Sequence, residues 1–539
     1  MNNSDEVKTM IKPLFFLLLT ITLLLSISPL LNNSFCDGWI IGKWIGAGAA
    51  SCVTIFIVSI VLSLSENAEK LKLNLELLIV PYLVICFVVV IHSILQITNI
   101  IPVHTYNGCN VLAGFDNPVG VASALTVSLP FTFVFLDKVK DRVIKYVVLS
   151  GTCGVVLTIL AIARSRVGIL ASGIVLLLYV LHTLENVKTR KIIAFLLSLI
   201  LLAVVVYMSF SKRGSNSGRA LILGVCWDMF KDAPLFGHGL HGFRSQYMLY
   251  QADYLEHCGS SVLPMLADNT THPLNEYALL AVNFGVIGIA TLLIGIIMTI
   301  MHFFKNQSNE SFVGIMTIAG IGVLSMFSYP FRYPLTLLGL LCALLLVYKD
   351  VLLNLSRTTM IIIRSITATI SALCLCLIII WAHYQIQWKQ LSVVSDNGND
   401  IKTVLEGYDS LYPKLRKDPY FLYNYAYVLS ENEDCEKAGD MATDSFGLMA
   451  NYDTALFIAD NAKECGNVDA AEEYYWLASK MCPVRFLPLY GLFRLYNEEC
   501  RFEEMKDMGQ LILTKPIKVH SNEVRMIRTQ VRQTMAYVF

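Results

Sequence analysis

The chain has 539 residues, of which 55% are hydrophobic and 15% are charged, and its formal net charge is zero. Soluble domains contain about 25% charged residues, so this composition excludes a disordered chain, a collagen-like chain and a small disulfide scaffold. No basic block points to a nucleic-acid partner. Residues 1–385 carry 42 charged side chains and the much shorter segment 386–539 carries 40. This predicts a transmembrane domain followed by a soluble, mildly acidic domain.

The first domain contains apolar stretches of about 20 residues, the length that a helix needs to cross a bilayer. We predict eleven such spans, and therefore an all-α polytopic membrane protein. The spans cover roughly residues 13–33, 44–64, 75–97, 118–137, 143–163, 165–184, 191–210, 277–304, 312–331, 333–353 and 361–385. One connection, residues 211–276, is long.

The distribution of Lys and Arg predicts the orientation, because cytoplasmic loops are enriched in both. With the N-terminus in the cytoplasm, fifteen fall in short inner loops and four in short outer loops. The inner set is Lys8, Lys12, Lys70, Lys72, Lys138, Lys140, Arg142, Lys145, Lys188, Arg190, Lys191, Lys305, Lys349, Arg357 and Arg364, and the outer set is Lys43, Arg164, Arg166 and Arg332. Residues 211–276 and, because eleven is odd, the C-terminal domain are then outside.

Two of the outer cations stand in one tight turn, "AIARSRVGIL", between two apolar stretches. Charges at membrane depth are costly and usually functional. Arg164 and Arg166 together therefore predict an anion site. The alternative is that both side chains snorkel to the membrane surface.

Residues 211–276 are the expected location of any chemistry. Their four histidines are His238, His241, His257 and His272, whose spacing matches no metal-ligand set. The segment "GHGLHG" does not follow a strand, so it is not a phosphate-binding loop. We expect no metal here.

The second domain, residues 386–539, has apolar residues at helical spacing and an internal period. Asn451, Pro483 and Pro516 each follow a helix pattern, 32 and 33 residues apart, and Ala438 and Ala471 are 33 apart. This period is similar to that of tetratricopeptide repeats, helix–turn–helix units of about 34 residues. Such arrays offer a concave face to a protein partner. A plain helical cap on the membrane domain is the alternative.

Eight of the 14 cysteines fall outside the membrane in this topology, where disulfides are allowed. They are Cys36, Cys109, Cys226, Cys258, Cys435, Cys465, Cys482 and Cys500. Cys465 and Cys500 are 35 apart, close to one repeat, which suggests that they pair. No cysteines have zinc-ligand spacing with a matching second pair.

Four stretches, in this order, resemble the bacterial O-antigen ligase and O-antigen polymerase superfamily of membrane glycosyltransferases. They are "FDNPVGVA" (115–122), "ARSRVG" (163–168), "GRALILGVCWDMFKDAPLFGHGLHGF" (218–243) and "HPLNEYALLAVNFGVIG" (272–288). The resemblance covers roughly residues 110–300. The chain departs from the family pattern at Leu223, at Leu274, where many members have His, and at Asn283, where Glu is common.

The resemblance implies a metal-independent enzyme without a cofactor in the bacterial inner membrane, with its long loop and C-terminal domain in the periplasm. The substrate would be a glycan on undecaprenyl diphosphate, and the acceptor a hydroxyl group of the lipid A core. An O-antigen polymerase and a protein O-oligosaccharyltransferase remain alternatives within the class. A non-enzymatic transporter of lipid-linked glycan is the alternative outside it, although it should carry ionisable groups in mid-span.

The candidate site residues follow from the resemblance and from the chemistry of a diphosphate leaving group. Guanidinium groups bind such a group bidentately and stabilise its developing charge. The expected diphosphate-binding residues are Arg164, Arg166, Arg219, Asn275 and Asn117, and the expected catalytic residues are His272 and Glu276. A histidine is suited to take the acceptor proton near neutral pH. His272 and Glu276 are four apart, so on a helix they would share a face.

Overall fold

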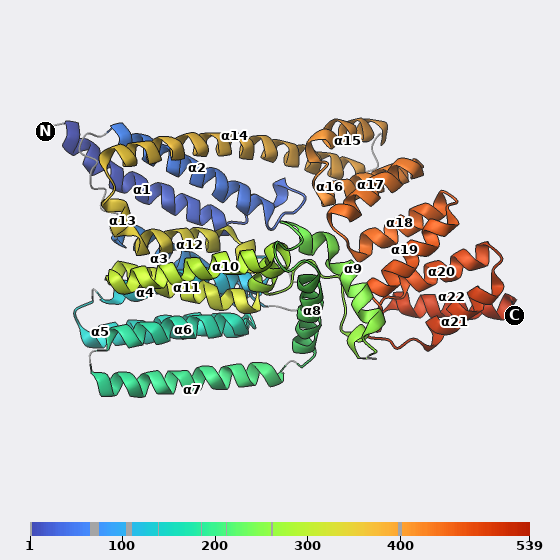
Figure 1. The fold of residues 1–539 in the computed structure, drawn as a ribbon, viewed down its shortest axis with the longest axis horizontal. Helices are drawn as coiled ribbons and strands as arrows, with labels where there is room; N and C mark the ends of the chain where they lie inside the picture. The colour runs from blue at the N-terminus through green and yellow to red at the C-terminus, as the bar shows by residue number, and fades with distance from the viewer. Residues whose placement is uncertain are drawn as a thin grey trace. The chain divides into compact units, whose positions relative to one another are not determined.

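The computed structural model describes residues 3–64, 75–103, 110–137, 139–184, 186–211, 213–259, 262–396 and 401–538. Lys70, Lys72, Lys138 and Cys109 lie outside these residues. Within the described ranges every regular element is helical, as predicted (Figure 1). The chain forms two compact units. The membrane unit comprises residues 1–211, 274–276 and 292–389, and the loop–repeat unit comprises residues 212–273, 277–291 and 390–539.

The membrane unit is a bundle of long apolar helices (Figure 1). They are α1 (Asn3–Ile27), α2 (Ile41–Leu64), α3 (Leu75–Ile97), α4 (Pro118–Asp137), α5 (Arg142–Ile162), α6 (Arg166–Thr183), α7 (Val187–Ser211), most of the second half of α10 (Glu276–Lys305), α11 (Asn309–Phe327), α12 (Pro334–Val347), α13 (Lys349–Leu353) and most of α14 (Arg357–Asp396), with short 3₁₀ turns η1 (Asn32–Ser34) and η4 (Pro330–Arg332).

Eight described helices are long and apolar enough to cross a membrane, and they coincide with eight of the eleven predicted spans. Two predicted spans are shorter apolar helices, Lys12–Ile27 and Pro334–Val347. The helix Lys12–Ile27 ends just before Pro29, which disfavours continuation of the helix. The helix Pro334–Val347 ends at Tyr348, directly before the charged residues Lys349 and Asp350. The predicted span 191–210 falls in α7, part of whose side chains lie outside the described set.

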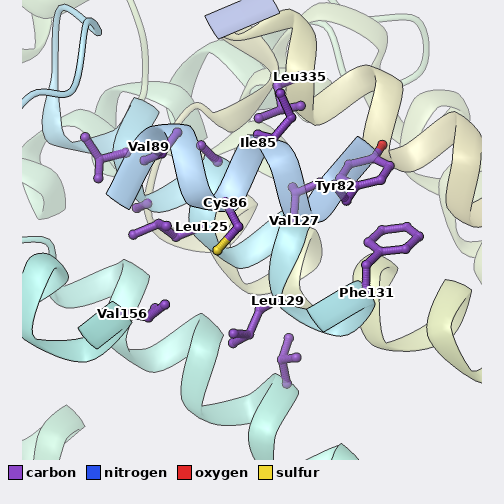
Figure 2. Packing of buried hydrophobic residues seen from close by; sticks show 14 of the residues in the cluster. Tyr82, Ile85, Cys86, Val89, Leu125, Val127, Leu129, Phe131, Val156 and Leu335 are labelled. Atoms are coloured by element: carbon purple, nitrogen blue, oxygen red, sulfur yellow. The ribbon is translucent and has the colours of Figure 1, made fainter. Parts of the chain in front are cut away.

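The core of the membrane unit surrounds α4, of which 83% of the most apolar window is buried. Figure 2 shows aliphatic and aromatic side chains of α3 and α4 packed together, with Val156 and Leu335 from neighbouring helices. The rings of Tyr82 and Phe131 are stacked with centroids 4.1 Å apart. Because α4 is covered on all sides, its ends are fixed, and its first turn can position a site.

The loop–repeat unit begins with α8 (Arg213–Asp232), α9 (Gly242–His257) and the 3₁₀ turn η3 (Leu263–Met265). One face of α8 packs against α9, with Leu221, Val225 and Met229 almost fully buried. The predicted long loop is therefore largely helical. The segment between α8 and α9 contains the "PLFGHG" motif and bonds to the first half of α10.

Helix α10 is broken at Gly285, which has φ +60° and ψ −154°. The N–H groups of Val286 and Ile287, which lose their helical acceptors at the break, donate to the carbonyl oxygens of Pro234 (2.8 Å) and Leu235 (3.3 Å). The N–H groups of His238 and Gly239 donate to the carbonyl oxygens before the break, on Val282 and Asn283, at 2.9 Å each. The loop thus satisfies the backbone groups that the break exposes.

Two glycines make this close approach possible. A Cβ on Gly237, whose φ is +67°, would lie 2.4 Å from the carbonyl carbon of Asn283. A Cβ on Gly285 would lie 2.5 Å from the backbone of Leu235. The side chain of Asn283 completes the joint, because its Oδ1 accepts from the N–H of Phe243 (3.0 Å) and its Nδ2 donates to the carbonyl of Leu240 (2.9 Å). The Pro-Leu-x-Gly-x-Gly pattern therefore allows the loop between α8 and α9 to bond closely to the broken helix α10.

The C-terminal part of this unit is a stack of helices in chain order (Figure 1). They are α15 (Ile401–Leu415), α16 (Pro419–Glu431), α17 (Cys435–Leu448), α18 (Tyr452–Glu464), α19 (Val468–Met481), α20 (Leu487–Glu498), α21 (Phe502–Thr514) and α22 (Asn522–Val538). The first residues of α17, α19 and α21 are 33 and 34 positions apart. Ala438 and Ala471 are fully buried at equivalent positions, so the predicted helical period is confirmed.

The predicted pairing of Cys465 with Cys500 is wrong. Cys465 is bonded to Cys435, with Cα atoms 5.8 Å apart, and Cys500 is free. The bond links the first residue of α17 to the end of α18, which are neighbours within the stack. A spacing of one repeat places two residues at equivalent positions on successive units, where they do not face each other. The repeat period therefore predicted the wrong partner for Cys465.

Candidate functional site

Five of the seven predicted site residues lie at one end of the membrane unit. Arg164 and Arg166 flank the turn between α5 and α6, and Asn117 precedes α4. The two segments meet because α6 packs closely on α4: a Cβ on Gly168 would lie 2.8 Å from the Cβ of Ala122. The structure therefore brings the two-arginine turn to the same end of the bundle as the start of α4.

The two arginines of the turn are in different environments. Arg164 is exposed and has φ +54°, while Arg166 begins α6 and is half-buried. Among the described residues, the guanidinium of Arg164 makes no ion pair. Buried Ser165 caps α6 by accepting from the N–H of Gly168 (3.3 Å). The turn is thus held by Ser165, and the charge of Arg164 faces outward.

Asn117 has a structural role in this end of the bundle. Its Oδ1 accepts from the N–H of Val119 at 3.1 Å, which caps the first turn of α4. The preceding residue, Asp116, makes contacts with α12 and η4 that the sequence did not predict. Its Oδ1 accepts from the hydroxyl of Tyr333 (2.7 Å), and its Oδ2 lies 3.3 Å from Nη2 of Arg332.

Lys43 joins the same group from the start of α2. Its side chain is almost completely buried, donates to the carbonyl of Trp39 (2.8 Å) and lies over the ring of Phe115. The carboxylates of Asp116 and Asp37 are the anions near its ammonium group. A buried lysine requires such counter-ions because an unpaired charge is expensive to bury.

Tyr333 and Trp44 fix this group further. Burial raises the pKa of Tyr333 well above its usual range, and the adjacent Asp116 carboxylate raises it further, so the hydroxyl remains a donor. The indole nitrogen of Trp44 donates to the carbonyl of Arg332 at 2.9 Å. Residues of α2 and η4, Tyr333 and the segment that precedes α4 are thereby connected in one polar network.

Asn275 and Glu276 are bonded to the end of α11 and to η4. The Nδ2 of Asn275 donates to the carbonyl of Met326 (2.9 Å), in the last turn of α11. The carboxylate of half-buried Glu276 accepts from the N–H of Phe331 (3.3 Å), the residue before Arg332. Of the predicted residues, Glu276 therefore contacts η4 directly, Asn275 contacts the end of α11 that precedes it, and Asn117 follows Asp116, which pairs with Arg332 of η4.

His272 does not lie on the helix that Glu276 begins, so the prediction that the two share a helix face is wrong. Helix α10 starts at Glu276, and residues 271–275 are irregular. Pro273 disfavours helical geometry for the residue before it, and Leu274 has φ +56°. His272 is half-buried in the segment that leads into α10.

Arg219 lies in α8 of the loop–repeat unit and is half-buried, one turn before Leu223. The expectation that Arg219 and His272 act in one site with the two-arginine turn stays a prediction. The other loop histidines are dispersed: His238 bonds the carbonyl of Met229 (2.7 Å) and His257 that of Asp253 (2.9 Å). Within the part of the chain that the structure describes, no cluster of three His, Cys, Asp or Glu is suited to a metal.

Left-handed backbone conformations occur close to the predicted residues. Ala113, Arg164 and Leu274 have φ values of +45°, +54° and +56°. Such residues cost of order 1–3 kcal/mol each and are concentrated at functional sites. Their positions, three residues before Asp116, at the arginine turn and directly before Asn275, support a site at this end of the bundle.

The same end contains a cavity of about 370 Å³ between η1 and α3, lined by Asn32, Trp39, His92 and Gln96 among others. The Oε1 of Gln96 accepts from the N–H groups of Leu112 and Ala113, at 2.9 and 2.8 Å. These two hydrogen bonds fix the backbone of residues 112–113, which lead to Asp116. No sequence pattern indicated this cavity.

Sequence reasoning missed Asp116, Tyr333, Lys43 and Arg332 as a group. A signal was present for two of them, because Lys43 and Arg332 are, with Arg164 and Arg166, the four cations that the predicted topology assigns to short outer loops. All four lie at the same end of the membrane unit. The exceptions to the predicted charge distribution therefore mark one end of the bundle.

Comparison with known proteins gives one family match. Residues 151–293 match the model of the O-antigen ligase family. The crystal structure of yeast Tom70 is similar to 78% of this chain and 89% of that chain, with 12% identity and a TM-score of 0.24, which is too low to carry an argument. No curated protein matches the chain.

Proposed function

We propose a specific reaction for this chain, which carries an O-antigen ligase domain and is a multi-pass membrane glycosyltransferase of the ligase and polymerase type. In this proposal it moves a glycan from undecaprenyl diphosphate to an acceptor hydroxyl at the periplasmic face of the bacterial inner membrane. The acceptor is the lipid A core, as in a ligase.

The observation that carries the proposal is the extent of the family match. Residues 151–293 include the two-arginine turn, Arg219 on α8, the loop that joins the break in α10, and the segment from His272 to Glu276. The match therefore covers six of the seven predicted site residues. The seventh, Asn117, lies at the same end of the bundle as the arginine turn.

Arg164, Arg166 and Arg219 supply the positive charge that the reaction needs. When the bond between the sugar and the diphosphate breaks, negative charge develops on the leaving phosphate oxygen. Guanidinium groups bind phosphate oxygens in pairs, and fixed cations stabilise the charge as it develops. The exposed guanidinium of Arg164 is available for such a ligand.

His272 is the proposed base. It takes the proton of the acceptor hydroxyl as the oxygen forms a bond to the anomeric carbon, and the bond from that carbon to the diphosphate oxygen breaks. Undecaprenyl diphosphate leaves with both bonding electrons. His272 precedes Asn275, a proposed diphosphate-binding residue, by three positions. The chain geometry therefore keeps their two Cα atoms within about 11 Å of each other. Glu276 is the alternative base.

The orientation is also proposed. Lys and Arg favour a cytoplasmic N-terminus, and the bond between Cys435 and Cys465 suits an oxidising compartment. The helical stack then stands in the periplasm, where it would engage a protein partner or the acceptor.

Deletion of the gene tests this function. Loss of the O-antigen ladder on lipid A core, with unmodified core accumulating, is expected. Retention of a single repeat unit on the core would indicate a polymerase, loss of glycan from proteins would indicate a protein transferase, and accumulation of carrier-linked glycan on the cytoplasmic side would indicate a transporter. Purified protein with lipid-linked glycan and core acceptor should form product without added metal or nucleotide sugar.

A further inference from the structure

Exposed apolar side chains lie on one face of α8 and in the loop that follows it. Leu223 and Trp227 are 42% and 59% exposed, and Leu235, Phe236 and Leu240 are 61%, 73% and 67% exposed. We call these five residues the α8–loop surface. On α8 the opposite face is the one that packs against α9, so this surface is a second apolar face that no described residue covers.

The backbone bonds of the loop place this surface relative to a membrane span. Pro234, Leu235, His238 and Gly239 are hydrogen-bonded to α10 at residues 282–287. Helix α10 is a candidate span, and only 11% of its most apolar window is buried, so it faces lipid over most of its length. The loop is therefore bonded to a lipid-facing helix some six to eleven residues after its start.

The length of α10 sets the depth. At its other end, His302 is bonded to Asp350 at 2.8 Å, and Lys305 is the last residue, which marks a polar boundary. From Val286, directly after the break, to His302 the continuous helix is about 24 Å long, which is most of the roughly 30 Å thickness of the hydrocarbon layer. If the polar end of α10 marks one boundary of the layer, residues 282–287 fall near the opposite boundary.

We infer that the α8–loop surface is inserted among the lipid acyl chains at the outer boundary of the bilayer. Exposed irregular backbone is not tolerated in hydrocarbon, but here the break in α10 and the loop satisfy each other's backbone groups. A helix with an apolar face, a polar face that carries Asp228 and Lys231, and a tryptophan is typical of the membrane interface.

The inference adds to the proposed function, and this consequence rests on that function. Arg219, Leu223 and Trp227 are spaced by four residues, so they lie along one face of α8. Insertion of Leu223 and Trp227 would hold the guanidinium of Arg219 at the level of the phosphate groups. A carrier diphosphate, whose lipid tail lies in the same bilayer, occupies that level.

Photo-crosslinking in the full chain tests the inference. Benzoylphenylalanine replaces Phe236 in protein reconstituted in phosphatidylethanolamine–phosphatidylglycerol nanodiscs, and mass spectrometry measures phospholipid adducts after illumination. Phe304, 66% exposed on α10, is the positive control, and Tyr427, 50% exposed on α16, is the negative control. We expect adducts at 236 in amounts comparable with 304 and on the order of tenfold above 427.

A second position removes dependence on one substitution. The same label in place of Trp227 should also give phospholipid adducts. Adducts at 304 with none above the level of 427 at either 227 or 236 would overturn the inference. The readout does not need glycan transfer, so an inactive protein with adducts would count against the proposed reaction and leave the membrane contact in place.

Discussion

The carboxamide of Asn283 bridges the break in α10 to the loop forty residues earlier: its oxygen accepts from the N–H of Phe243 and its nitrogen donates to the carbonyl of Leu240. Only a side chain with both a donor and an acceptor can make this pair of bonds. The amide of Asn283 is therefore suited to this position in a way that a carboxylate, which lacks the donor, is not.

Replacement of Asn283 should weaken this joint in a graded manner. Asn283→Leu leaves the buried N–H of Phe243 without its acceptor, which costs about 1–3 kcal/mol. Asn283→Asp keeps an acceptor but loses the donor to Leu240, so an intermediate effect is expected. Thermal unfolding in detergent should give the order wild type, Asp, Leu. Equal midpoints for wild type and Asn283→Leu would contradict the role of the bridge.

The two glycines of the joint should not tolerate alanine. Gly237→Ala and Gly285→Ala combine a left-handed backbone with a Cβ 2.4–2.5 Å from other backbone atoms, so we expect loss of folded, monodisperse protein. Gly239→Ala is the matched control: its φ is +90°, but no atom lies within 4 Å of the added Cβ, so only the backbone strain remains. Size-exclusion profiles of the three variants measure the difference, and equal profiles would refute it.

The arginines of the proposed diphosphate site should be needed for rate rather than folding. Loss of a charge-assisted bond in the transition state costs about 1.5–3 kcal/mol, which is roughly ten- to 150-fold in rate. Arg166→Ala and Arg219→Ala should each show this loss in a membrane transfer assay at equal expression. Arg→Lys should fail nearly as badly where the contact is bidentate.

Arg357→Ala, at an exposed arginine that begins α14, is the control for these variants and should transfer normally. Near-normal transfer by the double variant Arg166→Ala/Arg219→Ala would remove the diphosphate site as proposed.

The role of His272 has a distinct signature. His272→Ala should reduce transfer by about 10²–10⁴ if the imidazole is the general base. His257→Ala, in the same connection but exposed and bonded only within α9, should have little effect. If His272→Ala keeps normal activity while Glu276→Gln loses it, the base is Glu276.

The disulfide can be tested by mass mapping without reduction, which should find Cys435 joined to Cys465 and Cys500 free. The bond closes a loop with a sequence separation of 30, so its removal should destabilise the helical stack by about 3–4 kcal/mol.

In intact cells with a permeabilised outer membrane, an impermeant maleimide should label Cys500. Labelling only after lysis of the inner membrane would place the stack in the cytoplasm.

Several features of this protein were determined by the sequence alone. Apolar stretches of span length, the helical period of the tail and the outer-loop cations are local or periodic properties, and a helix needs only neighbouring residues to form its hydrogen bonds. The period therefore predicted equivalent positions for Ala438 and Ala471 before any contact was known. The motifs around Asn117, Arg166 and Asn275 likewise marked one end of the bundle.

The tertiary structure decided what depends on contacts between distant residues. The partner of Cys465, the counter-ions of Lys43 and the pairing of Asp116 with Arg332 join positions that no local pattern connects. The break at Gly285 is the clearest case, because a glycine in an apolar helix is ordinary until a loop supplies acceptors for the N–H groups that the break releases. Those acceptors come from Pro234 and Leu235, some fifty residues earlier in the chain, and only the folded backbone brings them there.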